Sequence, residues 1–329
     1  MSKYNVYFGT YSNSIFYGEF DSENGDLKMT GTTELENPSY LYLPHGEKIL
    51  YAVSEKRDGE VASVDLETKK IASRQKTNGA SPCHLCAQDK FLFAANYSEG
   101  TLSVFDLDND GKILKSFKSI AHYGKGANPN RQEKSHVHFV NRYEDYLAVC
   151  DLGLDRVIFY PYNDKTGISV TGGFEIVCPD GMGPRHIDFT HSHIYVLTEM
   201  GNKVLVYDKK HNLVQEISTL PADFDGKSTA AAVHISPDGK FLAASNRGHD
   251  SIIFYRINPD NGLLDTAGHI KTNRVPRDFA FSPDGKWILC GSETDNTLTV
   301  YEFNGADDIK SVKEISIPSP ICVLFGDKI

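Results

Sequence analysis

Four histidines occupy the same position of a four-residue sequence motif, called the phrase below, that this chain repeats. The phrase is a run of four residues such as Pro184-Arg185-His186-Ile187, and its third position is histidine in four consecutive copies, at His84, His138, His186 and His234. Imidazole exchanges protons near neutral pH, so histidines at equivalent positions could supply a general base or ligate a metal. A single such histidine can equally serve structure by pinning a neighbouring repeat. Together with the arginines near them, the set indicates a polar small-molecule site.

Three arginines lie at related places in the repeat. Arg185 and Arg277 hold the second position of the phrase, and Arg247 follows a strand-like run in Ser245-Asn246-Arg247-Gly248. A guanidinium group binds carboxylate or phosphate through a planar fork, although it can also form a plain ion pair with a carboxylate such as Glu199. The formal net charge is -10 and the pI about 5.6. A basic pocket on such a protein predicts a small anionic substrate, and the overall charge argues against nucleic acid or membrane as a partner.

A second set of polar residues follows the second strand-like run of each repeat. Aligned through the repeat, the set reads Glu55, Asn96, Asp151, Glu199, Asn246 and Glu293. Asn and Asp in such places often cap a turn, so each member has a structural interpretation as well as a functional one.

The repeat that carries these residues predicts the fold. Copies of the phrase begin near residues 38, 82, 136, 184, 232, 276 and 320. Each unit holds four short β-branched and aromatic runs separated by turns such as Ser236-Pro237-Asp238-Gly239, without helical periodicity. This pattern predicts an all-β, seven-bladed β-propeller with four antiparallel strands per blade. We expect residues 1–329 to form a single domain, whose closing strand 320–325 joins 4–34 in a blade built from both termini.

A propeller would bring the two sets of polar residues together. The innermost strand of each blade begins at the face where the second strand ends, so we expect both sets around the mouth of the central channel. A glycine-rich, basic insertion at residues 122–135 is expected to hang over that mouth. The predicted substrate-binding residues are Asn96, Gln132, His136, Asp151, His186, Asn246 and Arg277.

Other features of the chain bear on where the protein is located and on whether it uses a cofactor. The first residues enter strand-like sequence directly, so we expect no secretion signal, and no apolar run approaches the ~20 residues that span a bilayer. The six cysteines are scattered, which favours a reduced, cytoplasmic setting. Cys83 and Cys86 have the spacing of half a zinc site, but no second pair follows and their sulfurs would face opposite sides of a strand. We therefore predict no metal and no cofactor, and we expect a monomer or a weak homodimer.

Stretches in every repeat carry a family likeness. They are Phe8-Gly9-Thr10-Tyr11, Ala95-Asn96-Tyr97, Gln132 with His136-Val137-His138, Asp151-Leu152-Gly153, Gly183-Pro184-Arg185-His186, Val196-Leu197-Thr198-Glu199, Ser245-Asn246-Arg247-Gly248 and Pro276-Arg277-Asp278-Phe279. On these stretches the whole chain resembles the seven-bladed lactonase family. That family includes the propeller-type bacterial 6-phosphogluconolactonases and, more distantly, the fungal carboxy-cis,cis-muconate cyclases.

The resemblance implies an activity and a catalytic set. The activity is hydrolysis of a sugar lactone, most directly 6-phosphoglucono-δ-lactone to 6-phosphogluconate in the pentose phosphate pathway, without a metal. The implied catalytic residues are His138, Arg185, Glu199 and Arg247. We hypothesise that either His138 or Glu199 is the general base that activates water. Arg185 and Arg247 would stabilise the oxyanion or grip the substrate. Arg277 and the Lys125–Lys134 loop are expected to hold the phosphate.

Three alternatives stay open on the sequence alone. The first is a cycloisomerase, or a lactonase acting on another carboxylated ring, which would use the same residues. The second is a non-catalytic propeller that serves as a binding platform. The third is a metal-dependent gluconolactonase-type propeller, since several histidines could meet at the axis of the repeat.

Overall fold

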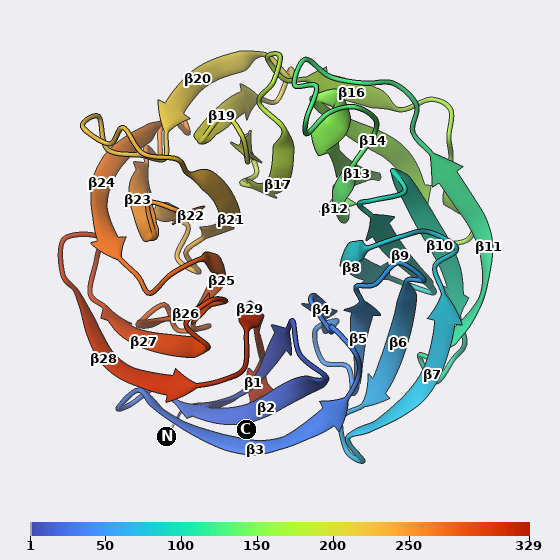
Figure 1. Ribbon diagram of the computed structural model, residues 1–329, viewed down its shortest axis with the longest axis horizontal. Coiled ribbons are helices and arrows are strands. Elements are labelled where there is room, and N and C mark those ends of the chain that lie inside the picture. The colour runs from blue at the N-terminus through green and yellow to red at the C-terminus, as the bar shows by residue number, and fades with distance from the viewer. Residues whose placement is uncertain (1) are drawn as a thin grey trace. The chain divides into compact units, whose positions relative to one another are not determined.

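The computed structural model describes residues 2–329, and their regular structure is almost entirely β-strand (Figure 1). Within these residues helical structure is confined to a 3₁₀ turn, η1 (Leu152–Leu154). The chain divides into two compact units. Unit 1 comprises Met1–Tyr11, Phe16–Gly31 and His186–Ile329, and unit 2 comprises Ser12–Ile15 and Thr32–Arg185. That residues 1–329 form one domain stays a prediction.

Unit 2 contains three antiparallel sheets, whose strands pair in chain order (Figure 1). The first comprises β4 (Leu41–Tyr42), β5 (Ile49–Ser54), β6 (Glu60–Asp65) and β7 (Lys70–Lys76). The second comprises β8 (Pro82–Gln88), β9 (Phe91–Asn96), β10 (Thr101–Leu107) and β11 (Ile113–Ala121). The third comprises β12 (Val137–Tyr143), β13 (Tyr146–Asp151), β14 (Arg156–Asn163) and two short strands, β15 (Gly167–Ile168) and β16 (Phe174–Val177).

The outer edge of the third sheet is interrupted, because β15 and β16 both pair with β14. Gly173 stands just before β16, and a Cβ atom there would lie 2.1 Å from the carbonyl oxygen of Phe159. Only glycine allows the two backbones to approach so closely at this point. The predicted fourth strand is therefore present as two pieces.

Four further antiparallel sheets consist mainly of unit 1 residues. The first comprises β17 (Pro184–Phe189), β18 (His193–Thr198), β19 (Lys203–Asp208) and β20 (Leu213–Ser218). The second comprises β21 (Thr229–Ile235), β22 (Phe241–Arg247), β23 (Ser251–Ile257) and β24 (Leu264–Lys271). The third comprises β25 (Pro276–Phe281), β26 (Trp287–Ser292), β27 (Thr297–Phe303) and β28 (Ile309–Ser316). The last comprises β29 (Pro320–Lys328), β1 (Lys3–Thr10), β2 (Ser14–Asp21) and β3 (Asp26–Glu34), in that order.

The last sheet joins the two ends of the chain. Strand β29 pairs with β1 through a register that runs from Tyr4 opposite Lys328 to Thr10 opposite Pro320. The final C-terminal strand thereby forms one edge of a sheet whose other strands come from the N-terminus (Figure 1). The prediction that 320–325 completes a sheet with 4–34 is confirmed.

The Ser-Pro-Asp-Gly turns explain why the repeat forms hairpins. In the turn after β21, the Ser236 hydroxyl donates to Asp238 Oδ1 at 2.6 Å and accepts from the Phe241 amide at 3.0 Å. Gly239 follows with a φ of 72°, a left-handed conformation that favours glycine. The turn between β25 and β26 repeats the same bonds with Ser282 and Asp284.

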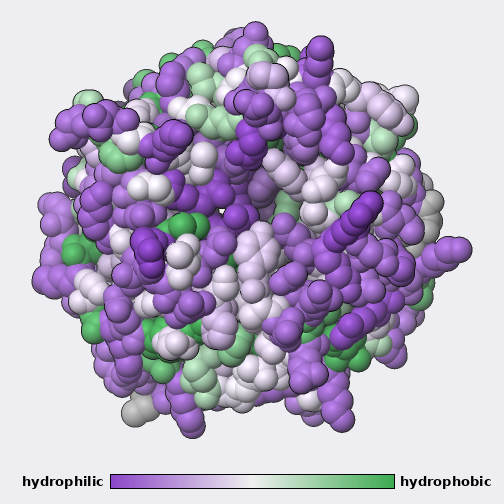
Figure 2. All heavy atoms as spheres, in the orientation of Figure 1, coloured by the Kyte–Doolittle hydropathy of each residue, from purple (hydrophilic) through white to green (hydrophobic). Residues whose placement is uncertain are grey.

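The core consists of apolar side chains packed between neighbouring sheets. Trp287, the single tryptophan of the chain, packs edge-on against Phe20 with ring centroids 5.9 Å apart. Its indole N–H donates to the carbonyl oxygen of Ser22 at 2.9 Å, so its polar atom is satisfied although the ring is buried. This contact fastens the terminal sheet to the sheet of β25–β28. Hydrophilic residues cover most of the surface seen in Figure 2.

Candidate active site

Two of the predicted site residues sit at β-bulges. In β12, the residues on either side of His138 pair with the consecutive residues 150 and 151 of β13, so His138 is the extra residue. In β25, the neighbours of Arg277 pair with consecutive residues 291 and 292 of β26 in the same way. A bulge re-aims a side chain and is often found next to binding sites. The backbone thus presents His138 and Arg277 differently from the regular strand positions around them.

Unit 1 contains a buried ion pair between Glu199 and Arg247. Nη2 of Arg247 lies 2.9 Å from Oε2 of Glu199, and the two side chains are only 14% and 5% exposed, respectively. The same nitrogen donates to the carbonyl oxygen of Ala230 at 2.9 Å. Removing two charges from water is costly, and apolar residues in their place often stabilise a protein. The buried pair therefore stays a candidate for function, as predicted for both residues.

The local backbone fixes both members of this pair. Glu199 directly follows β18, and its carbonyl oxygen accepts from the Ala230 amide at 3.1 Å. Arg247 ends β22, and its carbonyl oxygen accepts from the Ser228 hydroxyl at 3.0 Å. Gly248 then turns with a φ of 101°, and a Cβ atom there would lie 2.3 Å from the Lys227 carbonyl oxygen. The glycine in Ser245-Asn246-Arg247-Gly248 is thus required for the turn that places the arginine.

The other predicted residues of unit 1 differ in their surroundings. Asn246 is fully buried, and its amide nitrogen donates to the Thr219 carbonyl oxygen at 2.8 Å and to Ser251 Oγ at 3.3 Å. His186 is also buried. Arg277 is half-buried, with its guanidinium 5.2 Å from the ring centre of Tyr11 and 3.7 Å from Glu293. Asn246 therefore braces strands, whereas Arg277 is accessible to a ligand.

In unit 2, His136 and His138 both contact the ring of Tyr97. The His136 ring is stacked on it, with centroids 4.5 Å apart and an interplanar angle of 20°. The His138 ring meets it edge-on at 5.6 Å. Both histidines are buried, while Tyr97 is half-buried. The structure thus brings two predicted site residues together around one aromatic side chain that follows β9.

The insertion 122–135 is held at both ends by one carboxylate. Oδ2 of Asp151 accepts from Nδ1 of His122 at 2.8 Å and from the Ser135 hydroxyl at 2.6 Å. Oδ1 accepts from the His136 amide at 2.9 Å and caps η1 through the Leu154 amide. Asp151 is fully buried. Every one of these bonds is internal to the protein, so Asp151 positions the insertion.

Gln132 holds the middle of the insertion. It is fully buried, its amide nitrogen donates to the Leu152 carbonyl oxygen at 2.9 Å, and its side-chain oxygen accepts from the Asn128 amide at 2.9 Å. Asn96 is similar, since its amide nitrogen donates to the hydroxyls of Thr101 and Ser103. That Gln132, Asp151, Asn96 and Asn246 touch substrate stays a prediction.

Arg185 is buried near the start of β17, in a segment that Asp155 organises. The Asp155 carboxylate accepts from the amides of Gly181 at 2.8 Å and Gly183 at 2.7 Å. These bonds fix the chain immediately before Pro184-Arg185. Arg185 and His138 belong to unit 2, whereas Glu199 and Arg247 belong to unit 1. That all four act on one substrate stays a prediction.

Two further histidines of the repeated phrase have packing partners. The ring of His84 lies between Tyr40, at 3.9 Å between centroids, and Phe139, at 4.3 Å. Nε2 of His234 lies 2.9 Å from Oδ1 of Asp278. Burial alone would lower the pKa of His234, but its hydrogen bond to Asp278 and the charges of Asp278 and Asp188 outweigh burial and raise the pKa. Both histidines connect neighbouring sheets.

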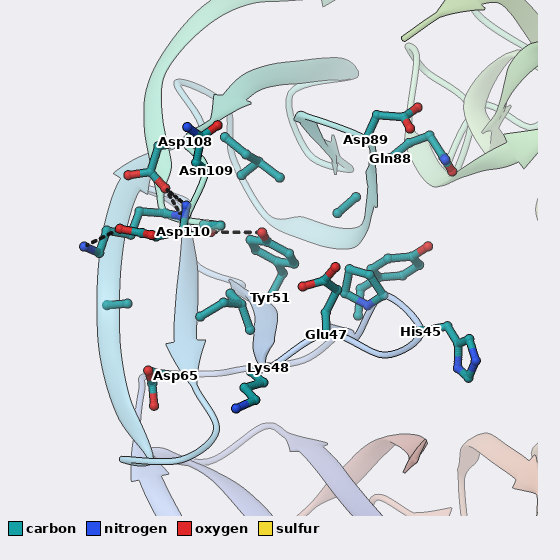
Figure 3. Close-up of a pocket in the computed structure, with 18 residues that line it drawn as sticks. His45, Glu47, Lys48, Tyr51, Asp65, Gln88, Asp89, Asp108, Asn109 and Asp110 are labelled. Carbon is teal, nitrogen blue, oxygen red and sulfur yellow. Dashed lines mark hydrogen bonds and ion pairs between the residues drawn. The ribbon is translucent and has the colours of Figure 1, made fainter.

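A separate cavity of about 860 Å³ lies in unit 2, where turns of the first two sheets meet (Figure 3). The Tyr51 hydroxyl donates to the Gly111 carbonyl oxygen at 2.9 Å. The Asp108 carboxylate accepts from the amides of Asp110 and Lys112. These groups stabilise the 108–112 turn, and none of the predicted site residues lines the cavity.

The sequence-based prediction covered Arg131 and Glu133 only as part of the Lys125–Lys134 loop and gave neither residue a role of its own. Nη2 of Arg131 donates to the Tyr97 hydroxyl at 3.2 Å. Oε1 of Glu133 lies 3.1 Å from Nε2 of His136, and the pKa of Glu133 is lowered by a hydrogen bond from its own amide and by the one from His136. The signal for both was their place in the insertion, a few residues before His136. A loop residue's partner across the sheet cannot be found from spacing alone.

No group of three or more His, Cys, Asp or Glu side chains within residues 2–329 is arranged to hold a metal ion. Over the same residues, no helix is both long and apolar enough to cross a membrane.

Comparison with known proteins gives a consistent result over the whole chain. The family model described as "Lactonase, 7-bladed beta-propeller" matches residues 5–325. A 6-phosphogluconolactonase from Bacillus subtilis is 33% identical, with 99% of each chain covered. The predicted seven-bladed propeller of four-stranded antiparallel blades is confirmed by this match.

Solved structures that are similar to this chain agree with the family match. A putative 6-phosphogluconolactonase from Bacteroides fragilis superposes with a TM-score of 0.91 at 29% identity, covering 99% of this chain and 98% of that one. A periplasmic gluconolactonase from Pseudomonas aeruginosa gives a TM-score of 0.90 at 27% identity, with 99% of each chain covered.

Proposed function

Since the chain belongs to the seven-bladed β-propeller lactonase family and is a 6-phosphogluconolactonase-like lactone hydrolase, we propose that it hydrolyses 6-phosphoglucono-δ-lactone to 6-phosphogluconate in the pentose phosphate pathway. The name of the Bacillus subtilis relative supports this substrate. The observation that carries the proposal is the buried pair of Glu199 and Arg247, which places a carboxylate and a guanidinium side by side.

The reaction adds one water molecule across the ester bond of the lactone ring. The water oxygen bonds to the carbonyl carbon while a base takes its proton, and the carbonyl oxygen becomes an oxyanion. The oxyanion then collapses, the bond from the carbonyl carbon to the ring oxygen breaks, and the ring oxygen takes a proton to become a hydroxyl group. The product is an open-chain acid, ionised at neutral pH. A base and a cation near the carbonyl group are therefore the chief requirements.

We assign the base to Glu199 or His138. The Glu199 carboxylate lies 2.9 Å from Arg247, and a positioned carboxylate can take a proton from water as a general base. His138 is buried at a bulge beside Tyr97, and its imidazole is the other candidate. Arg247 and Arg185 are proposed to stabilise the oxyanion or grip the substrate, which guanidinium groups do through charge-assisted hydrogen bonds.

The remaining predicted residues are proposed to bind or to position. His136, His186 and Arg277 would contact the substrate, and Arg277, together with the Lys125–Lys134 loop, would hold the phosphate. Asn96, Gln132, Asp151 and Asn246 are also proposed to bind the substrate. Their hydrogen bonds to other parts of the protein would in addition position these groups.

The substrate is tested by comparing hydrolysis of freshly generated 6-phosphoglucono-δ-lactone with that of unphosphorylated gluconolactone, each measured above its spontaneous rate. The proposal expects a higher kcat/KM for the phosphorylated lactone. A preference for the unphosphorylated lactone, or for an unphosphorylated carboxylated ring, would overturn it. No turnover of any lactone by folded protein would favour a binding platform instead.

We also propose a cytoplasmic location. All six cysteines are free thiols buried in the structure, which suits a reducing compartment. The Pseudomonas aeruginosa neighbour is named as periplasmic, so the family is not restricted to one compartment.

A further inference from the structure

Tyr97 is the meeting point of two basic side chains that come from a single short segment. Arg131 donates to its hydroxyl at 3.2 Å, and His136 stacks on its ring at 4.5 Å between centroids. The two groups therefore contact the same tyrosine side chain. All three residues belong to unit 2.

Both ring nitrogens of His136 face acceptor oxygens. Nδ1 lies 3.0 Å from the carbonyl oxygen of Tyr97, and Nε2 lies 3.1 Å from Oε1 of Glu133. The Glu133 carboxylate can only accept a hydrogen bond, so Nε2 is presented to an anionic acceptor.

Glu133 and His136 differ sharply in exposure. The Glu133 side chain is 51% exposed, whereas that of His136 is 7% exposed. An exposed carboxylate on a flexible side chain binds weakly and is easily exchanged for another anion. The His136 ring that it covers is fixed, because His136 is held by Asp151 through its amide and by Tyr97 through its ring.

The segment that presents Arg131 is also fixed rather than loose. Gln132 is fully buried and bonded to Leu152 and Asn128, and Ser135 is bonded to Asp151. Arg131 and His136 therefore stand on either side of anchored residues. Preorganised cations lose little entropy when an anion binds.

From this geometry we propose that Arg131 and His136 form an anion subsite for the phosphate of the lactone substrate. The Glu133 carboxylate occupies Nε2 of His136 until the phosphate displaces it. Arg131 offers a planar fork to two phosphate oxygens, and His136 offers Nε2–H to a third. The subsite would make Arg131 the residue that determines the preference for a phosphorylated over an unphosphorylated lactone. In this respect the inference rests on the proposed function.

Inorganic phosphate tests the subsite without any turnover. Isothermal titration calorimetry would compare the wild-type chain with Arg131→Gln, Glu133→Gln and a control, Arg142→Gln. Arg142 lies at the other end of β12, with its guanidinium 4.2 Å from the ring centre of Tyr162, so the control also removes an arginine braced on a tyrosine.

The three variants are expected to change the affinity for inorganic phosphate in different directions. Arg131→Gln weakens phosphate binding by about tenfold or more, the scale of a charge-assisted hydrogen bond. Glu133→Gln tightens it by about two- to fivefold, because a competing surface carboxylate is removed. Arg142→Gln leaves it unchanged. A gain in affinity cannot come from misfolding, so Glu133→Gln keeps the test decisive if Arg131→Gln is unstable.

Three results would overturn the subsite: no phosphate binding by the wild-type chain, an unchanged affinity in Arg131→Gln, or weaker binding in Glu133→Gln. With substrates, Arg131→Gln is expected to lower the ratio of kcat/KM for phosphorylated over unphosphorylated gluconolactone by about tenfold. If phosphate binds as described but no lactone is hydrolysed, the subsite stands and the proposed function fails.

Discussion

Arg247 and Glu199 form a buried ion pair in which one guanidinium nitrogen, Nη2, contacts both the carboxylate, at 2.9 Å, and the Ala230 carbonyl oxygen, also at 2.9 Å. The arginine ends β22 and the glutamate follows β18, so the pair ties two neighbouring sheets together. Its members were among the residues that the family resemblance implied for catalysis. Several tests bear on it and on the groups around it.

Replacing Glu199 with Gln removes the carboxylate but keeps its size. If Glu199 is the general base, kcat/KM for lactone hydrolysis falls by about 10²–10⁴-fold. Glu216→Gln is the matched control, because Glu216 pairs with Lys203 on the exposed part of the same unit. A fall in kcat/KM of less than threefold for Glu199→Gln would assign the base to His138 instead.

Removing only one member of the same pair should lower stability. Breaking a buried ion pair leaves one charge unpaired, so Glu199→Gln or Arg247→Met alone is expected to lower the free energy of unfolding by about 3–5 kcal/mol. The double variant leaves neither charge buried and should lose less than the sum of the two. Urea unfolding of all four proteins measures this coupling. Strictly additive losses would show that the two side chains do not interact.

Gly248 makes the turn that positions Arg247. Gly248→Ala places a Cβ atom 2.3 Å from the Lys227 carbonyl oxygen at a φ of 101°. It is expected to cost about 2 kcal/mol or more in unfolding free energy and to lower kcat/KM through Arg247. Gly239→Ala is the control, because its φ is 72° and nothing lies within 4 Å of the added atom. That variant should cost about 1 kcal/mol and leave kcat/KM unchanged.

Asp151 should control the order of the insertion 122–135. Asp151→Asn weakens charge-assisted bonds to His122 and Ser135, each worth about 1.5–3 kcal/mol. Amide hydrogen exchange across the insertion is expected to accelerate, and KM should rise more than kcat falls. Asp108→Asn, in the turn of Figure 3, serves as the control. If amide hydrogen exchange across residues 122–135 is the same in the Asp151→Asn variant as in wild type, contacts other than those of Asp151 hold the insertion.

His234 predicts a pH dependence of stability. Its pKa is raised above the usual 6.5, since Asp278 and Asp188 outweigh the effect of burial. The folded state therefore binds this proton more tightly than the unfolded chain does. The resulting stabilisation is complete below pH 6.5 and is lost as the pH rises through the raised pKa. Urea unfolding at low and high pH measures the free energy of unfolding of wild type and of His234→Gln. The loss of this free energy in the variant should be smaller at high pH than at low pH. An equal loss at the two pH values would falsify this prediction.

Much of the fold could be predicted because each repeat contains characteristic turn-forming residues at regular spacing. The Ser-Pro-Asp-Gly turns and the phrase found at the first strand of each repeat indicate strand positions through local chemistry, as Ser236 and Gly239 show for the turns. The bulge at His138 could not be predicted, because register depends on the partner strand. The different surroundings of Asn96 and Glu199 could not be predicted either. Asn96 ends β9 and Glu199 directly follows β18, but what each polar group bonds to depends on residues distant in the chain.

The central claim is that this chain hydrolyses a phosphorylated sugar lactone with arginines that act on the reacting group. The most direct test is kcat/KM for freshly generated 6-phosphoglucono-δ-lactone, above its spontaneous hydrolysis, for the wild-type chain, Arg185→Ala and Arg247→Ala. We predict clear turnover by the wild-type chain and its loss in both variants. Unchanged kcat/KM in both folded variants, or no turnover by the wild-type chain, would contradict the account.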